Sequence, residues 1–267
     1  MLFVGIDLAW SEKNGSGIAI LRGDKNRAEF IAADICHSDE DIIKYIERNV
    51  GVRNAFIAID APLIVPNKRG RRVAEKLVGI LFGKYDAGAH PANRERLSRW
   101  SGKIRGEEIA KRLEKMGFSH DPYVKKFEES RKFFEVYPHP SMVVVFNLSR
   151  VLKYKAKPKR DYRFRWSEFR SYQKHLKNLE RAKPALFLPE EITEKDVGKM
   201  KGRALKDYED LLDAIFCAYI AYYCWYKPEN CEILGDMREG YILTPVFGFM
   251  KEQLKALRSQ KKLIEFK

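Results

Sequence analysis

Four carboxylates stand inside apolar stretches of this sequence, where an isolated charge is costly. Asp7 ends the run FVGID, and Asp60 ends the run FIAID. Glu135 lies within FFEVY, and Asp213 is the one charged residue of the run LLDAIFCAYIAYYCWY. A buried charge is strongly destabilising unless a partner compensates it. One or two divalent cations would compensate four converging acids, and carboxylate oxygens suit Mg²⁺ or Mn²⁺ rather than zinc.

Each of these acids also has a simpler interpretation. Asp7 could cap the turn that follows it, and Asp60 could initiate the turn at Ala61-Pro62. Glu135 could pair with a lysine or arginine of the basic segment 150–183. Asp213 is the hardest to explain in this way, because the helical turns on both sides of it are apolar.

Two further residues are expected to support the acids from behind. If Asp207 caps the helix that contains Asp213, then Asp210 takes the third helical position, where it can reach back as in a capping box. We therefore interpret Asp210 as a capping or supporting residue and Asp213 as the ligand. His139 is the imidazole nearest to an acid motif, and its alternative role, between two prolines, is structural.

The acids need a sheet to bring them together. Four segments have the apolar or alternating pattern that is typical of strands: residues 2–8, 17–21, 27–34 and 55–59. Ser38 is a good cap for an amphipathic helix before the last of them. The order β-β-β-α-β predicts a mixed α/β sheet covered by helices. If the first and fourth strands are adjacent and parallel, Asp7 and Asp60 lie side by side at their carboxyl ends, where open α/β sheets bind ligands.

The whole chain is predicted to form a single domain, residues 1–267, with polar and basic insertions at about 66–132 and 150–206. The length of 267 residues suits such a domain and allows a sizeable core. The other expected elements are a strand over 131–137, a helix capped by Ser141, a helix from Asp207, a strand over 241–243 and a terminal basic amphipathic helix.

The charge of the chain favours a polyanionic partner. Its 51 Lys and Arg against 37 Asp and Glu give a formal net charge of +14. Residues 150–183 hold 13 Lys or Arg and 3 acids, with aromatic residues interleaved. Basic side chains can neutralise phosphates and exposed aromatics can stack on bases, although these aromatics could instead face the core. The residues expected to bind nucleic acid are Lys157, Lys159, Arg160, Arg163 and Trp166, with a second cluster of Lys68, Arg69, Arg71 and Arg72.

Four motifs together resemble one known family. GIDLAW at 5–10, AIDAPL at 58–63, EVYPHP at 135–140 and DLLDAIFCAY at 210–219 are similar to motifs of the domain-of-unknown-function 429 family (DUF429). Members of that family are described as predicted nucleases of the ribonuclease H-like fold. The resemblance implies a ribonuclease H-like mixed sheet flanked by helices, and it carries the family's acids over to Asp7, Asp60, Glu135 and Asp213. The basic helical insertion lies outside the resemblance.

The predicted function is therefore metal-dependent hydrolysis of phosphodiester bonds in nucleic acid, with two Mg²⁺ or Mn²⁺ ions held by the four acids. One alternative is a non-catalytic nucleic-acid-binding protein of the same fold. The other is an ATP-dependent kinase of the actin-like fold, although the sequence has no Walker loop. The four cysteines form no CxxC pair, and no stretch has the features of a signal peptide or a membrane span. We therefore expect a cytoplasmic protein without a membrane partner, and DNA and RNA remain equal candidates.

Overall fold

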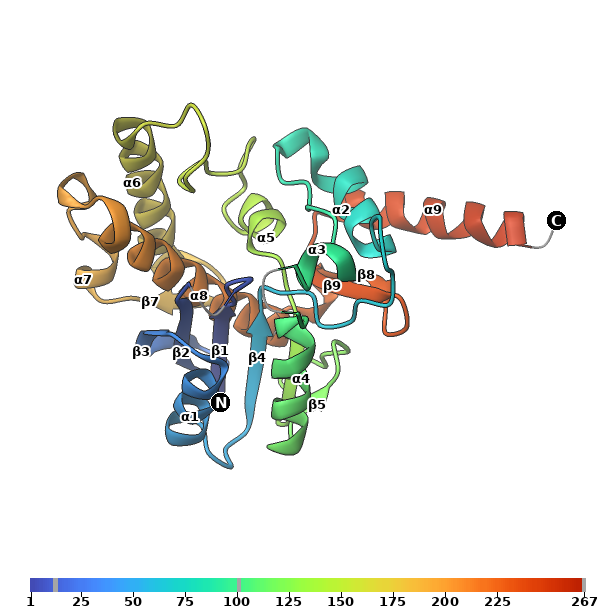
Figure 1. Ribbon diagram of the computed structural model, residues 1–267, viewed down its shortest axis with the longest axis horizontal. Helices are drawn as coiled ribbons and strands as arrows, with labels where there is room; N and C mark the ends of the chain where they lie inside the picture. The colour runs from blue at the N-terminus through green and yellow to red at the C-terminus, as the bar shows by residue number, and fades with distance from the viewer. Residues whose placement is uncertain (12–13, 100–101, 266–267) are drawn as a thin grey trace.

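The computed structural model describes residues 1–11, 14–99 and 102–265, with the backbone alone for 260–265. The strands of its central sheet are β1 (Leu2–Asp7), β2 (Ser16–Gly23), β3 (Arg27–Cys36), β4 (Ala55–Ile59), β5 (Ser119–His120), β6 (Arg131–Glu135) and β7 (Ala185–Phe187). Across the described residues, these seven strands lie in the order β5-β6-β4-β1-β2-β3-β7 (Figure 1).

The sheet is mixed. β1 pairs in parallel with β4 and antiparallel with β2, which pairs antiparallel with β3. β4 is also parallel to β6, so the carboxyl ends of β1, β4 and β6 share one edge of the sheet. Between β3 and β4 runs α1 (Asp39–Asn49), whose cap is Ser38: its Oγ accepts a hydrogen bond from the Asp41 amide at 3.0 Å. The predicted mixed α/β sheet and its β-β-β-α-β order are confirmed.

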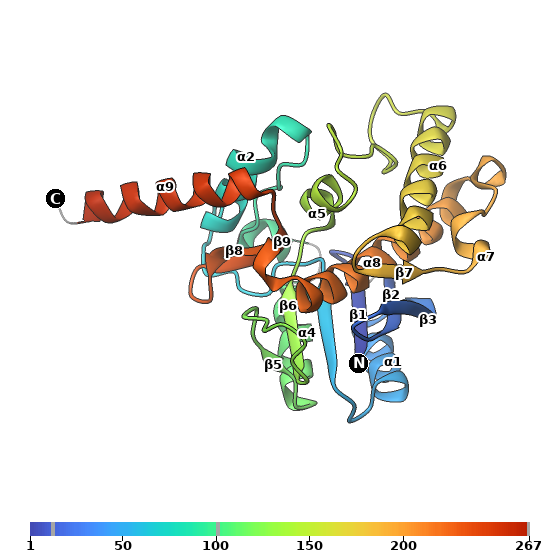
Figure 2. The ribbon, with the colours of Figure 1, turned by 180° about the vertical axis from the view of Figure 1, so that it is seen from behind.

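Helices cover both faces of the sheet (Figure 2). On one face, α1 and α4 (Arg105–Lys115) bury apolar side chains against Val4 and Ile6 of β1. On the other face, α8 (Gly202–Tyr226) and α6 (Tyr162–Asn178) form a larger core with Phe3 of β1. The alternation of side chains along β1 therefore divides the core into two layers.

Helix α8 lies directly on the backbone of β1 and β2. A Cβ atom on Gly5 would be 2.0 Å from the Ala214 carbonyl oxygen, and one on Gly17 would be 2.1 Å from the Asp210 carbonyl oxygen. Only glycine allows the two backbones to approach so closely. Gly17 is the register partner of Asp7, so the turns of α8 that start at Asp210 lie beside the end of β1.

The remaining elements lie outside the central sheet. They are α2 (Val73–Phe82), α3 (Arg94–Leu97), α5 (Pro138–Val145), α7 (Glu190–Thr193), the hairpin of β8 (Cys231–Asp236) and β9 (Gly240–Pro245), α9 (Gly248–Glu265), and the 3-10 turns Gly83–Tyr85, Leu179–Arg181, Val197–Lys199 and Pro228–Asn230. α9 projects away from the body of the molecule (Figures 1 and 2). In the part of the chain that the structure describes, no helix combines the length and apolarity that a bilayer crossing requires.

Two helix starts differ from the prediction. α5 begins at Pro138 with Tyr137 as its cap residue, so Ser141 lies inside the helix and its Oγ donates to the Tyr137 carbonyl at 3.1 Å. α8 begins at Gly202, earlier than predicted, so Asp207 does not cap it. Proline is well suited to the first position of a helix, and the preference of Asp207 for a cap does not outweigh the helical residues that precede it.

The segment 150–206 contributes a strand to the main sheet and a helix to the larger core. β7 within it pairs in parallel with β3 at the edge of the main sheet. Phe169, Tyr172 and Leu176 on α6 are fully buried in the larger core. Their spacing is that of the buried face of an amphipathic helix, which was the alternative interpretation of these aromatics.

Candidate functional site

The expected acids reach one cavity from different elements. Asp7 ends β1, and Asp60 directly follows β4, where its amide donates to the Ile6 carbonyl at 2.9 Å. Both side chains line a cavity of about 980 Å³ together with Asp210 of α8. Asp213 lies one turn further along α8, fully buried behind the cavity floor. The parallel pairing of β1 with β4 and the glycine contact of α8 together produce this convergence.

Asp210 belongs to the acid group itself. Its carboxyl group is within hydrogen-bonding reach of Asp7, and it accepts a hydrogen bond from Lys206 Nζ at 2.5 Å. Burial and the charge of Asp7 raise the pKa of Asp210 to about 8. The prediction that Asp210 is a capping residue is wrong, because the helix starts two turns earlier and Asp210 faces β1.

Burial and mutual repulsion also shift the pKa values of Asp7 and Asp60. Burial raises the pKa of Asp7, with a further contribution from Asp213, while Lys155 and Lys206 act in the opposite direction. Burial and the charge of Asp7 raise the pKa of Asp60 well above its usual range. Crowded carboxyl groups of this kind titrate as a coupled set and are typical of functional sites.

A lysine side chain lies among these acids. Lys155 comes from the irregular segment between α5 and α6, and its Nζ is 2.7 Å from Asp213 Oδ2. Burial opposes its charge, but the attraction of Asp213, Asp7 and Asp60 raises the pKa of Lys155 well above its usual range. The lysine therefore supplies positive charge at the point where the sequence predicts a metal ion.

Two tyrosines hold the other oxygen of Asp213. The hydroxyl groups of Tyr154 and Tyr172 donate to Asp213 Oδ1 at 2.6 and 3.3 Å. Both tyrosine side chains are fully buried in the larger core. Asp213 is thus fixed on one side by hydroxyl groups and faces Lys155 on the other.

Glu135, which lines the same cavity, is bound by an arginine. Its two oxygens accept hydrogen bonds from the Arg72 guanidinium at 2.5 and 3.0 Å, and the Leu63 amide donates to Oε2 at 2.9 Å. The Glu135 side chain is 3% exposed, and burial raises its pKa despite Arg72. Both oxygens of Glu135 thus have protein donors, and its expected role as a metal ligand stays a prediction.

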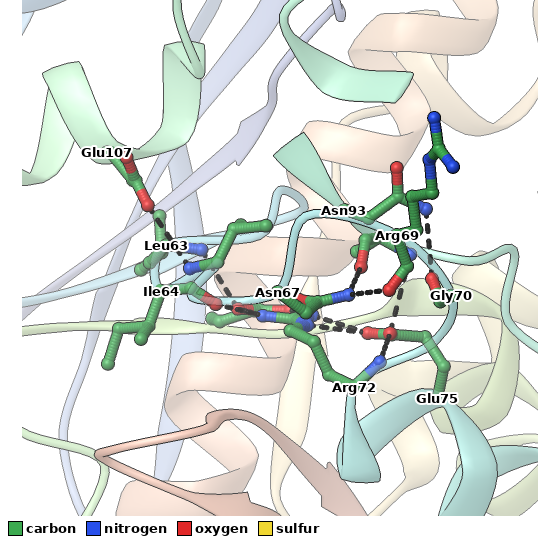
Figure 3. Close-up of polar contacts among 12 residues, drawn as sticks. Leu63, Ile64, Asn67, Arg69, Gly70, Arg72, Glu75, Asn93 and Glu107 are labelled. Carbon is green, nitrogen blue, oxygen red and sulfur yellow. Dashed lines mark hydrogen bonds and ion pairs between the residues drawn. The ribbon is translucent and has the colours of Figure 1, made fainter. Parts of the chain in front are cut away.

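Arg72 is correspondingly not a surface residue. Its side chain is 1% exposed, and besides Glu135 it binds Glu75 and the Ile64 carbonyl, with Nε and Nη1 each donating at 2.8 Å (Figure 3). Arg72 lines the cavity, but its guanidinium is bound by two glutamates, and the predicted contact with nucleic acid stays a prediction. Two buried carboxylates, which desolvation would otherwise destabilise, explain why it turns inward.

The other predicted basic contacts fall into two groups. Lys157 and Arg160 line the cavity, and Arg160 Nη1 also donates to the carbonyls of Lys153 and Lys155 at 3.2 and 3.1 Å. Five others are exposed and do not line the cavity: Lys68, Arg69, Arg71, Lys159 and Arg163. Arg69 pairs with Glu95 at 2.7 Å.

Trp166 does not present a free face. Its Nε1 donates to the Met200 carbonyl at 2.9 Å, and the half-buried indole packs against the larger core. The expectation that it stacks on bases is replaced by the alternative, a packing role. An aromatic residue that lines the cavity with an exposed ring is Trp10, which is 41% exposed and lies 5.2 Å from the Arg96 guanidinium.

His139 lies on the cavity wall beside Tyr154. The two rings are stacked with their centroids 6.3 Å apart, and burial, followed by the charge of Lys155, lowers the pKa of His139 to about 3. Its buried Nδ1 has no hydrogen-bond partner among the described residues. A neutral imidazole with a free ring nitrogen is thus available at the wall.

The donor set suits a hard cation, but the arrangement does not yet form a metal site. Among the described residues, no three His, Cys, Asp or Glu side chains lie close enough together to hold a metal ion as they stand. Asp213 Oδ2 is buried and accepts no hydrogen bond in the described structure, and it faces the Lys155 ammonium. The carboxylates therefore have the chemistry for Mg²⁺ or Mn²⁺, while Lys155 stands between them.

Sequence reasoning missed the basic and hydroxyl partners of the acids. Lys206 has a recognisable signal, because it precedes Asp210 by four residues on a helix and can therefore reach it. Lys155 and Tyr154 have no such signal. They lie in KYKAKPKR, where every second residue is a lysine, so no pattern distinguishes one lysine from the others. Only the tertiary fold shows which lysine of that segment turns inward.

Comparison with known proteins agrees with the motifs. No curated protein matches the chain. A family model described as "Protein of unknown function (DUF429)" matches residues 5–239 of the 267, which includes every acid of the cavity. The four motifs that contain these acids thus lie inside one continuous match, and the chain belongs to the domain-of-unknown-function 429 family.

Proposed function

We propose that the protein is a metal-dependent nuclease that hydrolyses phosphodiester bonds at the acidic cavity. The observation that carries this proposal is the convergence of Asp7, Asp60 and Asp210, from two parallel strands and one helix, at a cavity of about 980 Å³, with the buried Asp213 one helical turn beyond Asp210. The fold and the placement of these acids resemble the ribonuclease H-like fold. Divalent cations bound there would activate a water molecule and stabilise the leaving oxygen.

The charge of the cavity rim supports a phosphate-containing substrate. Lys157 and Arg160 line the cavity above the acids and can contact phosphates on either side of the reacting one. Trp10, which lies at the rim and presents an exposed ring, can stack on a base. The residues of this chain would thus position the nucleic acid, while the acids hold the cations.

The test is a cleavage assay with Mn²⁺ or Mg²⁺ and fluorescent single-stranded, duplex, hybrid and branched substrates. We expect at least one substrate to be cut by the wild-type protein and none by Asp60→Asn. The matched control is Asp34→Asn, which changes an exposed acid of β3 and should cleave like the wild type. Absence of cleavage by the wild type, or equal cleavage by Asp60→Asn, would overturn the proposal.

A second candidate is a nucleic-acid-binding protein that has no catalytic activity. The observation that favours it is Lys155, which lies 2.7 Å from Asp213 and compensates the acids without any metal. This candidate predicts that the wild type binds the same substrates whether or not Mn²⁺ is present, and that none of them is cleaved.

A further inference from the structure

Lys155 comes from an irregular segment, whereas the acids it faces come from regular elements. The acids lie on β1, after β4 and on α8, which are packed backbone against backbone. Lys155 lies in the segment from 146 to 161, which has no helix or strand. Side chains hold this segment: Arg160 binds the Lys153 and Lys155 carbonyls, and Arg165 Nε donates to the Tyr154 carbonyl at 2.9 Å. Tyr154 anchors the segment in the larger core, so withdrawal of Lys155 from the acids means a reorientation of its side chain, which breaks no backbone pairing of the sheet or α8.

The lysine and a divalent cation compete for the same oxygens. Nζ of Lys155 is 2.7 Å from Asp213 Oδ2, and its charge also acts on Asp7 and Asp60. Asp213 Oδ2 accepts no hydrogen bond from the described residues, so the ammonium is what faces it. A cation bound to the same oxygen would be within a few Å of the ammonium, where two positive charges repel each other strongly.

We propose that Lys155 is an internal counter-ion that occupies the cation site of the metal-free protein, and that divalent cations bind at Asp7, Asp60 and Asp213 only when Lys155 withdraws. This inference rests on the proposed function for the nature of the cation, but not for the cleavage of nucleic acid. Withdrawal would also free the ammonium to face the cavity, whose rim already carries Lys157 and Arg160.

The first test measures Mn²⁺ binding by electron paramagnetic resonance, without any substrate. Lys155→Met keeps much of the side-chain volume and removes the competing charge, so it should bind Mn²⁺ about tenfold more tightly than the wild type. Lys155→Arg keeps the charge and should bind no more tightly. The matched control is Lys174→Met, an exposed lysine of α6, which should leave the affinity unchanged. Equal or weaker Mn²⁺ binding by Lys155→Met would overturn the proposal.

The second test uses the wild-type protein, so it does not depend on the folding of a variant. Lysines are acetylated briefly with acetic anhydride and quantified by mass spectrometry, with and without saturating Mn²⁺. The Lys155 side chain is 25% exposed, so we expect slow labelling without Mn²⁺ and several-fold faster labelling with it. Lys174 should label at the same rate in both conditions. Unchanged or slower labelling of Lys155 on Mn²⁺ saturation would contradict withdrawal.

The two proposals fail in different ways. If Lys155→Met gains Mn²⁺ affinity and no substrate is cut by either protein, the counter-ion inference holds and the nuclease proposal fails. If the wild type cleaves in a metal-dependent way but Lys155→Met gains no affinity, the nuclease proposal holds and the counter-ion inference fails.

Discussion

At the scale of single residues, the acids differ in what compensates their charge. Glu135 has a buried guanidinium and a backbone amide, whereas Asp210 has the ammonium of Lys206. Asp213 has Lys155 on one oxygen and two tyrosine hydroxyl groups on the other. Glu135 thus has a buried arginine partner, while the compensation of Asp213 comes in part from a lysine in an irregular segment.

Replacement of Asp213 tests this compensation. In Asp213→Asn the amide oxygen still accepts from the tyrosines, but Lys155 loses its nearest counter-charge. We expect the metal-free variant to lose about 1–3 kcal/mol in the free energy of unfolding, measured by urea denaturation, and to lose Mn²⁺-dependent cleavage. Asp207→Asn, on the same helix but partly exposed and paired with Arg203, should change stability by less than about 1 kcal/mol. A more stable Asp213→Asn variant would mean that repulsion among the acids outweighs the attraction of Lys155.

The partly buried His120 is expected to reduce the free energy of unfolding as the pH falls. Its ring stacks on Phe133 with centroids 4.5 Å apart, its Nε2 is 2.9 Å from the Tyr241 hydroxyl, and burial lowers its pKa to about 4. An unfolded histidine titrates near 6.5, so between about pH 6.5 and pH 4 the unfolded chain binds more protons than the folded one. The stabilisation is therefore complete above about pH 6.5 and is lost as the pH falls to about 4.

The measurement is the free energy of unfolding from pH 7 to pH 4 for the wild type and for His120→Gln. The glutamine cannot titrate, so the difference between the two proteins should shrink as the pH falls. Parallel pH profiles would show that His120 takes up its proton equally well in the folded protein.

At the scale of elements, the contact between α8 and the strands β1 and β2 positions the site. Two glycines allow this contact, and Gly17 lies opposite Asp7 in the register. The helix therefore cannot rise from the sheet without carrying Asp210 and Asp213 away from Asp7. The geometry of the acids depends on the absence of a side chain as much as on the acids themselves.

Gly17→Ala tests this dependence. The new Cβ atom would be 2.1 Å from the Asp210 carbonyl oxygen, so α8 or β2 must shift. We expect a loss of more than about 2 kcal/mol in stability and a weaker Mn²⁺ affinity, because overpacking against a backbone is poorly relieved. Gly79→Ala, in the middle of α2 with nothing within 4 Å of its Cβ, should be neutral or more stable by up to about 1 kcal/mol. Thermal and urea unfolding of both variants decide between these outcomes.

The elements that the sequence predicts well are those with local patterns. Apolar runs predict the first four strands, and a serine cap predicts α1. The positions of Asp7 and Asp60 can then be predicted because they stand where apolar runs end. The capping preference of Asp207 predicts the wrong start for α8, because the residues before Asp207 are already helical. The ion pairs of Arg72 with Glu135 and of Lys155 with Asp213 join residues about 60 positions apart, and no local pattern encodes such pairings.

At the scale of the whole molecule, the basic residues behind the net charge of +14 divide into those paired with acids inside the protein and those exposed to solvent. Arg72, Lys155 and Lys206 form ion pairs with buried acids. Lys157 and Lys159 keep their charges on the surface near the cavity. The net charge therefore overstates the surface charge that is available to a polyanion.

The salt dependence of nucleic-acid binding tests this surface. In the double variant Lys157→Ala, Lys159→Ala, we expect weaker binding and a slope of log affinity against log salt that is reduced by about 1–2, because each lost phosphate contact releases fewer counterions. Arg160 is left intact since it holds the backbone at Lys155. Lys44→Ala, Lys111→Ala, on α1 and α4, removes the same charge elsewhere and should keep the slope. Fluorescence anisotropy with a labelled single strand in EDTA measures both quantities. An unchanged slope in the first variant would assign the binding to another surface.

The contrast between the rigid acids and the irregular segment of Lys155 has a consequence for hydrogen exchange. Amides of β1 and α8 are bonded within a ladder and a helix that pack on each other, so they should exchange only when the whole protein unfolds. Amides around Lys155 lie outside any regular element and should exchange through small local openings that cost far less free energy. The two charges of one ion pair thus belong to parts of the molecule whose amides are expected to exchange with very different opening free energies.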